Sequence, residues 1–214
     1  MSFDRLAAHY GWMEAVVAGP RLQRSRVAWI DRLADRRRLL IAGVGHGRFL
    51  RAFLARRPSA RVTCLDASRG MLHEARERAR RAGCDLARVE FVHARLPEWS
   101  PPAEPFDAIV TNFFLDCFPP AELAATVACL ASAAAPDARW LLADFAVPKR
   151  GPPRWRAQAV HALMYAFFRA TTGIQARALT EPDPLLAAHG FVLRGRKSAE
   201  GGLLRADWWE RVSR

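Results

Sequence analysis

Three glycines within five positions follow an apolar run and could let a ligand approach the backbone. Gly43, Gly45 and Gly47 lie in the stretch RLLIAGVGHGRFL, after residues that favour a buried strand. A glycine-rich turn between a strand and a helix is where open α/β sheets bind nucleotides. The dinucleotide fingerprint would place a small residue at position 48, where this chain has Arg48. The spacing allows close backbone approach but suits a pyrophosphate less well.

An acidic residue follows where a ribose-binding group is expected. Asp66 ends the run RVTCLD, about twenty residues after the glycines, and a carboxylate there can accept hydrogen bonds from both ribose hydroxyls. The glycines and this acid together predict an adenosine-type cofactor. A nicotinamide cofactor or a degenerate site without a ligand remain alternatives.

The elements that must position these residues alternate between short apolar runs and amphipathic helices. Strands are expected over 38–43, 61–66, 89–94, 106–112 and 139–145, with helices over 47–57, 68–83 and 119–134. Ser68 is placed to cap the second of these helices and Gly83 to close it. Strands buried on both faces and joined by helices predict a doubly wound, parallel α/β sheet.

The whole chain, residues 1–214, is predicted to form a single domain. Its 214 residues, of which 51% are hydrophobic, are enough to build one hydrophobic core. Within it we expect an N-terminal helical cap over 1–37, a core over 38–145, a helical insertion or lid over 146–190 and a closing hairpin over 191–214. A helix over 154–171 and a shorter one near 182–190 are expected inside the insertion.

Several motifs occur in an order that is similar to class I S-adenosylmethionine-dependent methyltransferases. IAGVGHG resembles the glycine motif, CLDAS the ribose-binding acid, FVHARLPEW the turn beside the adenine, FDAIVTNFFLDCF the fourth strand with its substrate-side loop, and RWLLADF the fifth strand. The two ends of the chain resemble, more loosely, the ubiquinone/menaquinone biosynthesis C-methyltransferases. The resemblance implies a Rossmann-like sheet of seven strands, mostly parallel with the last strand antiparallel, and S-adenosylmethionine as the cofactor.

The same resemblance implies which residues contact the cofactor. They are Tyr10, Gly43, Gly45, His46, Gly47, Asp66, Ala67, Arg95, Leu96 and Asn112. Two positions depart from the family pattern, since Ile41 and Arg95 stand where relatives usually carry acids. The backbone amide of Leu96 can still meet the adenine edge. His46 has an alternative role as an exposed loop residue without function.

The catalytic candidates are Asp116, Tyr10, His161 and Tyr165. Asp116 occupies the substrate-side loop, while Asp144 is expected to act as a base or, more simply, to pair with an arginine. His161, Tyr165 and Arg169 recur at i, i+4 and i+8 on one helix face and could form a polar acceptor pocket or a surface stripe. Arg177 could clamp an anionic acceptor. A base is needed only for a protonated or weak acceptor.

Transfer of a methyl group to the carbon, oxygen or nitrogen of a small molecule is therefore the expected function. The net charge of +12 and pI near 11.1 keep an RNA or protein methyltransferase as an alternative, but the arginines are spread along the chain. The third hypothesis is a protein that binds S-adenosylmethionine but does not methylate, or that uses it in another reaction.

The four cysteines have no C-x-x-C spacing, so the sequence predicts neither a metal site nor a disulfide framework. Free cysteines are typical of a reducing cytoplasm. No leader or membrane span is expected, although loose membrane association and any oligomeric state remain open.

Overall fold

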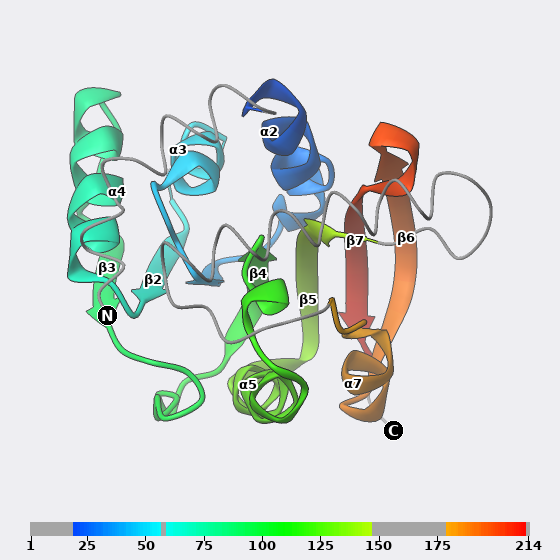
Figure 1. The fold of residues 1–214 in the computed structure, drawn as a ribbon. Helices are drawn as coiled ribbons and strands as arrows, with labels where there is room; N and C mark the ends of the chain where they lie inside the picture. Colours follow the sequence, from blue (N-terminus) through cyan, green and yellow to red (C-terminus); the bar gives the residue numbers. More distant parts are fainter. Residues whose placement is uncertain (1–18, 57–58, 147–178, 213–214) are drawn as a thin grey trace.

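A seven-stranded sheet forms the centre of the part of the chain that the structure describes. The structure is a computed structural model, and it describes residues 19–56, 59–146 and 179–212 (Figure 1). The strands are β1 (Arg38–Ala42), β2 (Arg61–Asp66), β3 (Val89–His93), β4 (Phe106–Asn112), β5 (Ala134–Phe145), β6 (Phe191–Ala199) and β7 (Leu204–Arg211). Their order is β3-β2-β1-β4-β5-β7-β6, and only β7 runs antiparallel to its neighbours. The predicted α/β sheet with an antiparallel last strand is confirmed.

Helices cover both faces of this sheet. The bounds are α2 (Gly19–Val27), α3 (Arg48–Leu54) and α4 (Arg69–Arg81) on one face, with the short helix η2 (Ile30–Leu33), and α5 (Pro120–Ser132) and α7 (Asp183–Ala188) on the other. Figure 1 shows the first group above the sheet and the second below it. Two further short helices are η3 (Leu115–Cys117), after β4, and η4 (Glu200–Gly202), between β6 and β7.

Each central strand supplies side chains to two hydrophobic cores, which explains its continuous apolar run. In β1, Leu40 and Ala42 join the core under α5 and α7, while Leu39 and Ile41 join the core under α3 and α4. All four side chains are buried. Burial on both faces is expected of a parallel sheet between two helical layers.

The ends of α4 follow the expected capping chemistry. Ser68 precedes the helix, and its hydroxyl accepts a hydrogen bond from the backbone N–H of Met71 at 3.1 Å. Gly83 lies just beyond the helix with a φ of +70°, a conformation that glycine adopts without strain. Both predictions are confirmed.

The junction of α5 and β5 differs from the prediction. The helix ends at Ser132 and the strand begins at Ala134, not at Arg139. The backbone N–H of Phe106 bonds the carbonyl of Ala133 at 2.8 Å, and a register shift follows between Phe106 and Ala108. β5 therefore starts earlier than predicted, because β4 pairs with Ala134, a residue that the sequence pattern assigned to the preceding helix.

Two tryptophans attach the N-terminal elements to the closing hairpin. The indole N–H of Trp29 donates to the carbonyl of Ala206 at 2.9 Å, and its ring lies 5.9 Å from that of Trp208. β6 and β7 form an antiparallel hairpin in the region where a closing hairpin was predicted. The remaining predicted cap, residues 1–18, and most of the predicted insertion, residues 147–178, lie outside the described residues. Within the described ranges, no helix has the length and apolar character needed to cross a membrane.

Candidate active site

The carboxyl ends of the parallel strands bring the predicted site residues to one edge of the sheet. The glycine loop follows β1, Asp66 ends β2, and Asn112 ends β4 next to β1. Asp144 lies near the end of β5, which pairs with β4. This edge is where open α/β sheets bind their ligands.

The glycine loop has the geometry of a close-contact site. Gly43, Gly45 and Gly47 have φ values of +69°, +50° and +70°. A side chain at Gly43 would place its Cβ 2.2 Å from Cδ2 of Phe114, and one at Gly47 would lie 2.9 Å from Cα of Ala75. A Cβ at Gly45 would meet nothing within 4 Å. Gly43 and Gly47 therefore lack a side chain because neighbouring protein atoms occupy that space. Gly45 faces open space.

Asp66 connects the two strand ends. Its Oδ2 accepts the backbone N–H of Gly45 at 3.0 Å, and its Oδ1 accepts that of Ser68 at 2.9 Å. Burial raises the pKa of this carboxyl, while these hydrogen bonds and the nearby charge of His46 act in the opposite direction. Each carboxylate oxygen retains a further acceptor site. Asp66 is thus held in a fixed orientation and can still accept hydroxyl groups.

The turn predicted to lie beside the adenine is adjacent to Asp66. His93 pairs in register with Asp66, and the N–H of Ala94 donates to the Asp66 carbonyl at 3.2 Å. Leu96 is buried, whereas Ala67 and Arg95 are exposed. The structure therefore brings the predicted ribose and adenine segments together, with the Arg95 side chain in solvent.

His46 is buried, at 5% exposure, so its reading as an exposed loop histidine is wrong. The reason is that the loop folds back between β1 and α4, with Gly47 packed against Ala75. Ile41, at the position where relatives usually carry an acid, is also buried, in the core beneath α3 and α4.

Asn112 carries a polar group without a partner in the described part of the chain. Its amide Nδ2 is buried and forms no hydrogen bond there. Buried donors normally have a partner, so each exception needs an explanation. The orphaned amide and the open space at Gly45 both fit a ligand at this edge, and the residues present fit an adenosyl cofactor.

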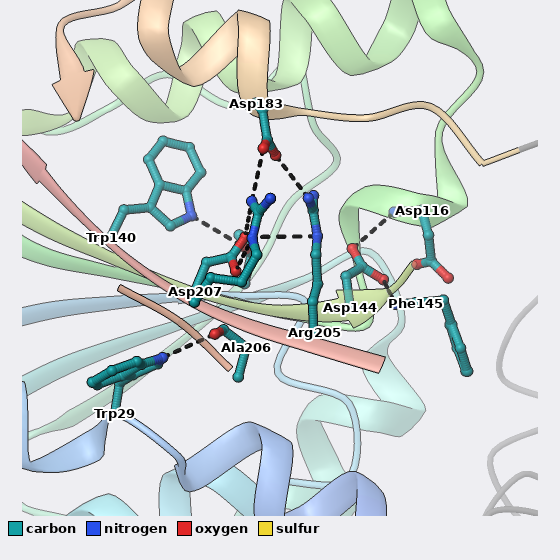
Figure 2. A network of polar contacts seen from close by, with 11 residues as sticks. Trp29, Asp116, Trp140, Asp144, Phe145, Asp183, Arg205, Ala206 and Asp207 are labelled. Carbon is teal, nitrogen blue, oxygen red and sulfur yellow. Dashed lines mark hydrogen bonds and ion pairs between the residues drawn. The ribbon is translucent and has the colours of Figure 1, made fainter. Parts of the chain in front are cut away.

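Two buried carboxyl groups meet beyond the ends of β4 and β5. The backbone N–H of Asp116, in η3, donates to Oδ2 of Asp144 at 3.3 Å, and the N–H of Phe145 donates to Oδ1 at 2.9 Å (Figure 2). Asp116 is 8% exposed and Asp144 is 3% exposed.

Burial shifts both carboxyl groups toward the protonated form. It raises the pKa of Asp116 to about 6, although hydrogen bonds from Cys117 and Asp144 lower it. The pKa of Asp144 is raised well above its usual value, first by burial and then by the charge of Asp116, against a lowering by Arg205.

Among the described residues, Asp144 does not form the expected ion pair with an arginine. Arg205 lies opposite it in the β5–β7 register, but the guanidinium instead contacts Asp183 at 2.7 Å and Asp207 at 3.7 Å. Arg196 also binds both of these carboxylates, each at 2.7 Å. We call Asp183, Arg196, Arg205 and Asp207 the ion-pair cluster (Figure 2).

Aromatic residues that the sequence reasoning did not single out lie next to the carboxyl pair in the sequence. Phe114 and Phe118, on either side of η3, are 5.1 Å apart, and Phe113 lies 5.2 Å from Phe145. All four side chains are partly exposed. The spacing in NFFLDCF was a usable signal, because a turn of helix brings residues four apart together.

Several predicted site residues lie outside the described residues, namely Tyr10, His161, Tyr165, Arg169 and Arg177. Among the residues that are described, no three metal-ligating side chains are grouped as a metal site.

Comparison with known proteins gives a family match. Residues 39–137 match the model of a methyltransferase domain family. A search of curated proteins finds no significant match. The chain is similar to the solved structure of mitomycin 7-O-methyltransferase, with a TM-score of 0.74 and 20% identity. That comparison covers 99% of this chain and 61% of the mitomycin enzyme, so this chain spans less than two thirds of it.

Two further structures have similar folds. Magnesium protoporphyrin IX methyltransferase from Synechocystis PCC 6803, solved with bound S-adenosylhomocysteine, has a TM-score of 0.65 and 21% identity over 88% of this chain and 83% of its own. For 1,6-didemethyltoxoflavin-N1-methyltransferase from Burkholderia thailandensis, the TM-score is 0.66 and the identity 22%, over 96% of this chain and 84% of its own. Residues 39–137 thus match a methyltransferase domain family, and the described chain shares the fold of these methyltransferase structures.

Proposed function

We propose that this protein transfers a methyl group from S-adenosylmethionine to a small-molecule acceptor by in-line displacement. The observation that carries the proposal is the bond between Asp66 and the N–H of Gly45, which joins the predicted ribose acid to the glycine loop beside open space. In the bound state the cofactor would supply a methyl group on a positively charged sulfur.

Different residues at the carboxyl ends of the parallel strands would hold different parts of that cofactor. The free acceptor sites of Asp66 suit ribose hydroxyls, and the turn at Leu96 suits the adenine. The loop at Gly45 and the orphaned amide of Asn112 suit the methionine end. Tyr10 remains a proposed contact on the basis of the family resemblance.

Asp116 is the proposed acceptor-facing group among the described residues. It lies in the turn after β4, and Phe114 of that turn packs against Gly43 of the cofactor loop. The likeness to small-molecule methyltransferases supports a small acceptor. Because alignment of the acceptor with the methyl group supplies much of the rate, residues that position the acceptor matter most. We propose a cytoplasmic location, which is consistent with the four free thiols.

The decisive experiment is a thermal shift measured with S-adenosylmethionine, S-adenosylhomocysteine and NADH. A ligand at about 100 times its Kd stabilises the folded state by roughly 2.7 kcal/mol, which should raise Tm by roughly 5–11 °C for a chain of this size. We expect a shift with the two adenosyl ligands and none with NADH. No shift with either would contradict the proposal and favour a degenerate site.

Two variants make this test residue-specific. Asp66→Ala should weaken binding of S-adenosylmethionine strongly, because it removes the proposed ribose contact and the bond that holds Gly45. Asp85→Ala is the matched control, since within the described ranges that exposed carboxylate bonds only the N–H of Ala87 in the following loop. Equal affinities in the two variants would refute the ribose assignment.

A further inference from the structure

Two side-chain amides each have a buried atom without a hydrogen-bond partner in the described part of the chain. They are Oε1 of Gln23, in α2, and Nδ2 of Asn112, at the end of β4. Buried polar atoms normally have a partner, so each of these atoms points to a group that binds there. The first atom is an acceptor and the second is a donor. Together they suit a ligand that carries a cationic donor and an anionic acceptor.

Gln23 lies beside the end of the glycine loop. Its Nε2 donates to the backbone carbonyl of Arg48 at 3.4 Å, and Arg48 begins α3 directly after Gly47. A carbonyl can only accept, so this contact fixes the orientation of the amide and leaves Oε1 as the atom without a partner. The acceptor is therefore held next to the loop that forms the proposed cofactor site.

The helix α2 reaches from the glycine loop to the end of β4. Gln23 and Arg26 are three residues apart, so they lie on the same face of this helix. The guanidinium carbon of Arg26 lies 4.8 Å from the centre of the Phe113 ring, and Phe113 directly follows Asn112. The strand that Asn112 ends pairs with β1, which leads into the glycine loop. The two amides thus belong to elements that meet around this loop.

We propose that Gln23 and Asn112 bind the amino acid end of S-adenosylmethionine. Oε1 of Gln23 accepts a hydrogen bond from the ammonium group, and Nδ2 of Asn112 donates one to the carboxylate. This inference rests on the proposed function, because it assumes the same cofactor, and it adds a residue of α2 to the cofactor site.

The neutrality of both amides fits this ligand group. The amino acid end of the cofactor carries one positive and one negative charge, so its net charge is zero. Two neutral amides can bind it without leaving a protein charge buried and unpaired. Ile41, which stands where relatives usually carry an acid, is buried in the core and offers no side-chain acceptor.

The role of Gln23 is tested by calorimetric titration with two ligands. One is S-adenosylhomocysteine, and the other is its deaminated analogue, in which a hydrogen replaces the α-amino group. Gln23→Met keeps the length of the side chain but removes the acceptor. We expect this variant to bind S-adenosylhomocysteine roughly 10- to 100-fold more weakly than wild type, and to bind the deaminated analogue within about twofold of wild type. An equal loss for both ligands would overturn the assignment.

Gln23→Glu separates the two functions of the amide. Glutamate keeps an acceptor but cannot donate to the carbonyl of Arg48. We expect it to bind S-adenosylhomocysteine at least as tightly as wild type does. If Gln23→Glu bound as weakly as Gln23→Met, the bond to Arg48 would account for the effect and the proposal would fail. Arg24→Gln is the control, since Arg24 is the next residue of α2 and is exposed, and it should bind both ligands as wild type does.

The role of Asn112 is tested in the same way with decarboxylated S-adenosylhomocysteine. Asn112→Asp replaces the donor by a carboxylate, which would repel the carboxylate of the ligand. We expect a strong loss of affinity for S-adenosylhomocysteine and little loss for the decarboxylated analogue. Variant effects that do not depend on the amino or carboxyl group would overturn this inference alone. If wild type bound neither S-adenosylmethionine nor S-adenosylhomocysteine, the proposed function itself would be refuted.

Discussion

Two groups of buried carboxylates lie near one another in this protein, and their surroundings differ. In the ion-pair cluster, Asp207 is fully buried and binds Arg196 through both oxygens at 2.7 Å. In the carboxyl pair, Asp116 and Asp144 are almost as buried, and Asp144 accepts the backbone N–H groups of Asp116 and Phe145. A buried charge is stable when it is paired, and otherwise it tends to become neutral. The ion pairs of the cluster are thus expected to stabilise the fold, whereas burial raises the pKa of both carboxyl groups of the pair.

The largest expected effect is the loss of the central carboxylate of the cluster. Asp207→Ala leaves Arg196 without its bidentate partner and Arg205 with Asp183 alone. Removing one partner of a buried ion pair costs about 3–5 kcal/mol, so urea unfolding should show a loss of that size. A loss below about 1 kcal/mol, as is usual for exposed pairs, would show that the cluster is not structural.

Removing the guanidinium of Arg205 should affect both the ion-pair cluster and the pKa of Asp144. Arg205→Met should lower the free energy of unfolding by roughly 2–3 kcal/mol, because Asp183 and Asp207 lose a donor. The variant also removes the charge that lowers the pKa of Asp144. The stability lost as pH rises should therefore extend to higher pH than in wild type. Identical pH profiles would show that Arg205 and Asp144 are uncoupled.

Replacing the other member of the pair should relieve the repulsion. The pKa of Asp116 is raised to about 6, so in wild type its contribution to stability decreases as pH rises from ~4 to ~6. Asp116→Asn removes this pH-dependent cost, so the free energy of unfolding of the variant relative to wild type should be roughly 3 kcal/mol higher at pH 8 than at pH 4. Denaturant unfolding at the two pH values measures this. A gain that is the same at both would argue against a shifted carboxyl.

An exposed ion pair provides the smallest expected effect. Arg21 and Glu200 are 2.9 Å apart, but the Arg21 side chain is 59% exposed. Arg21→Gln should change the free energy of unfolding by no more than about 0.5 kcal/mol. A loss comparable to that of Asp207→Ala would mean that burial does not account for the difference between the buried and exposed ion pairs.

Much of the fold was predictable because its signals are local. The apolar runs predicted the parallel strands, and Ser68 and Gly83 marked the ends of α4. The start of β5 was predicted wrongly, since pairing with Phe106 extends the strand into residues without an apolar run. The cofactor edge followed from the glycines and Asp66, whereas the roles of individual site residues remain predictions.

The sequence alone determined where the backbone could turn tightly and where a carboxylate would end a strand. Those properties depend on residue type and on distances of a few residues. Only the tertiary structure decided that His46 is buried, that Asp144 meets Asp116 rather than an arginine, and that Arg205 turns to Asp183. These residues are far apart in the chain, and their charge states depend on burial and on neighbours a few ångströms away. No local pattern in the sequence encodes those distances.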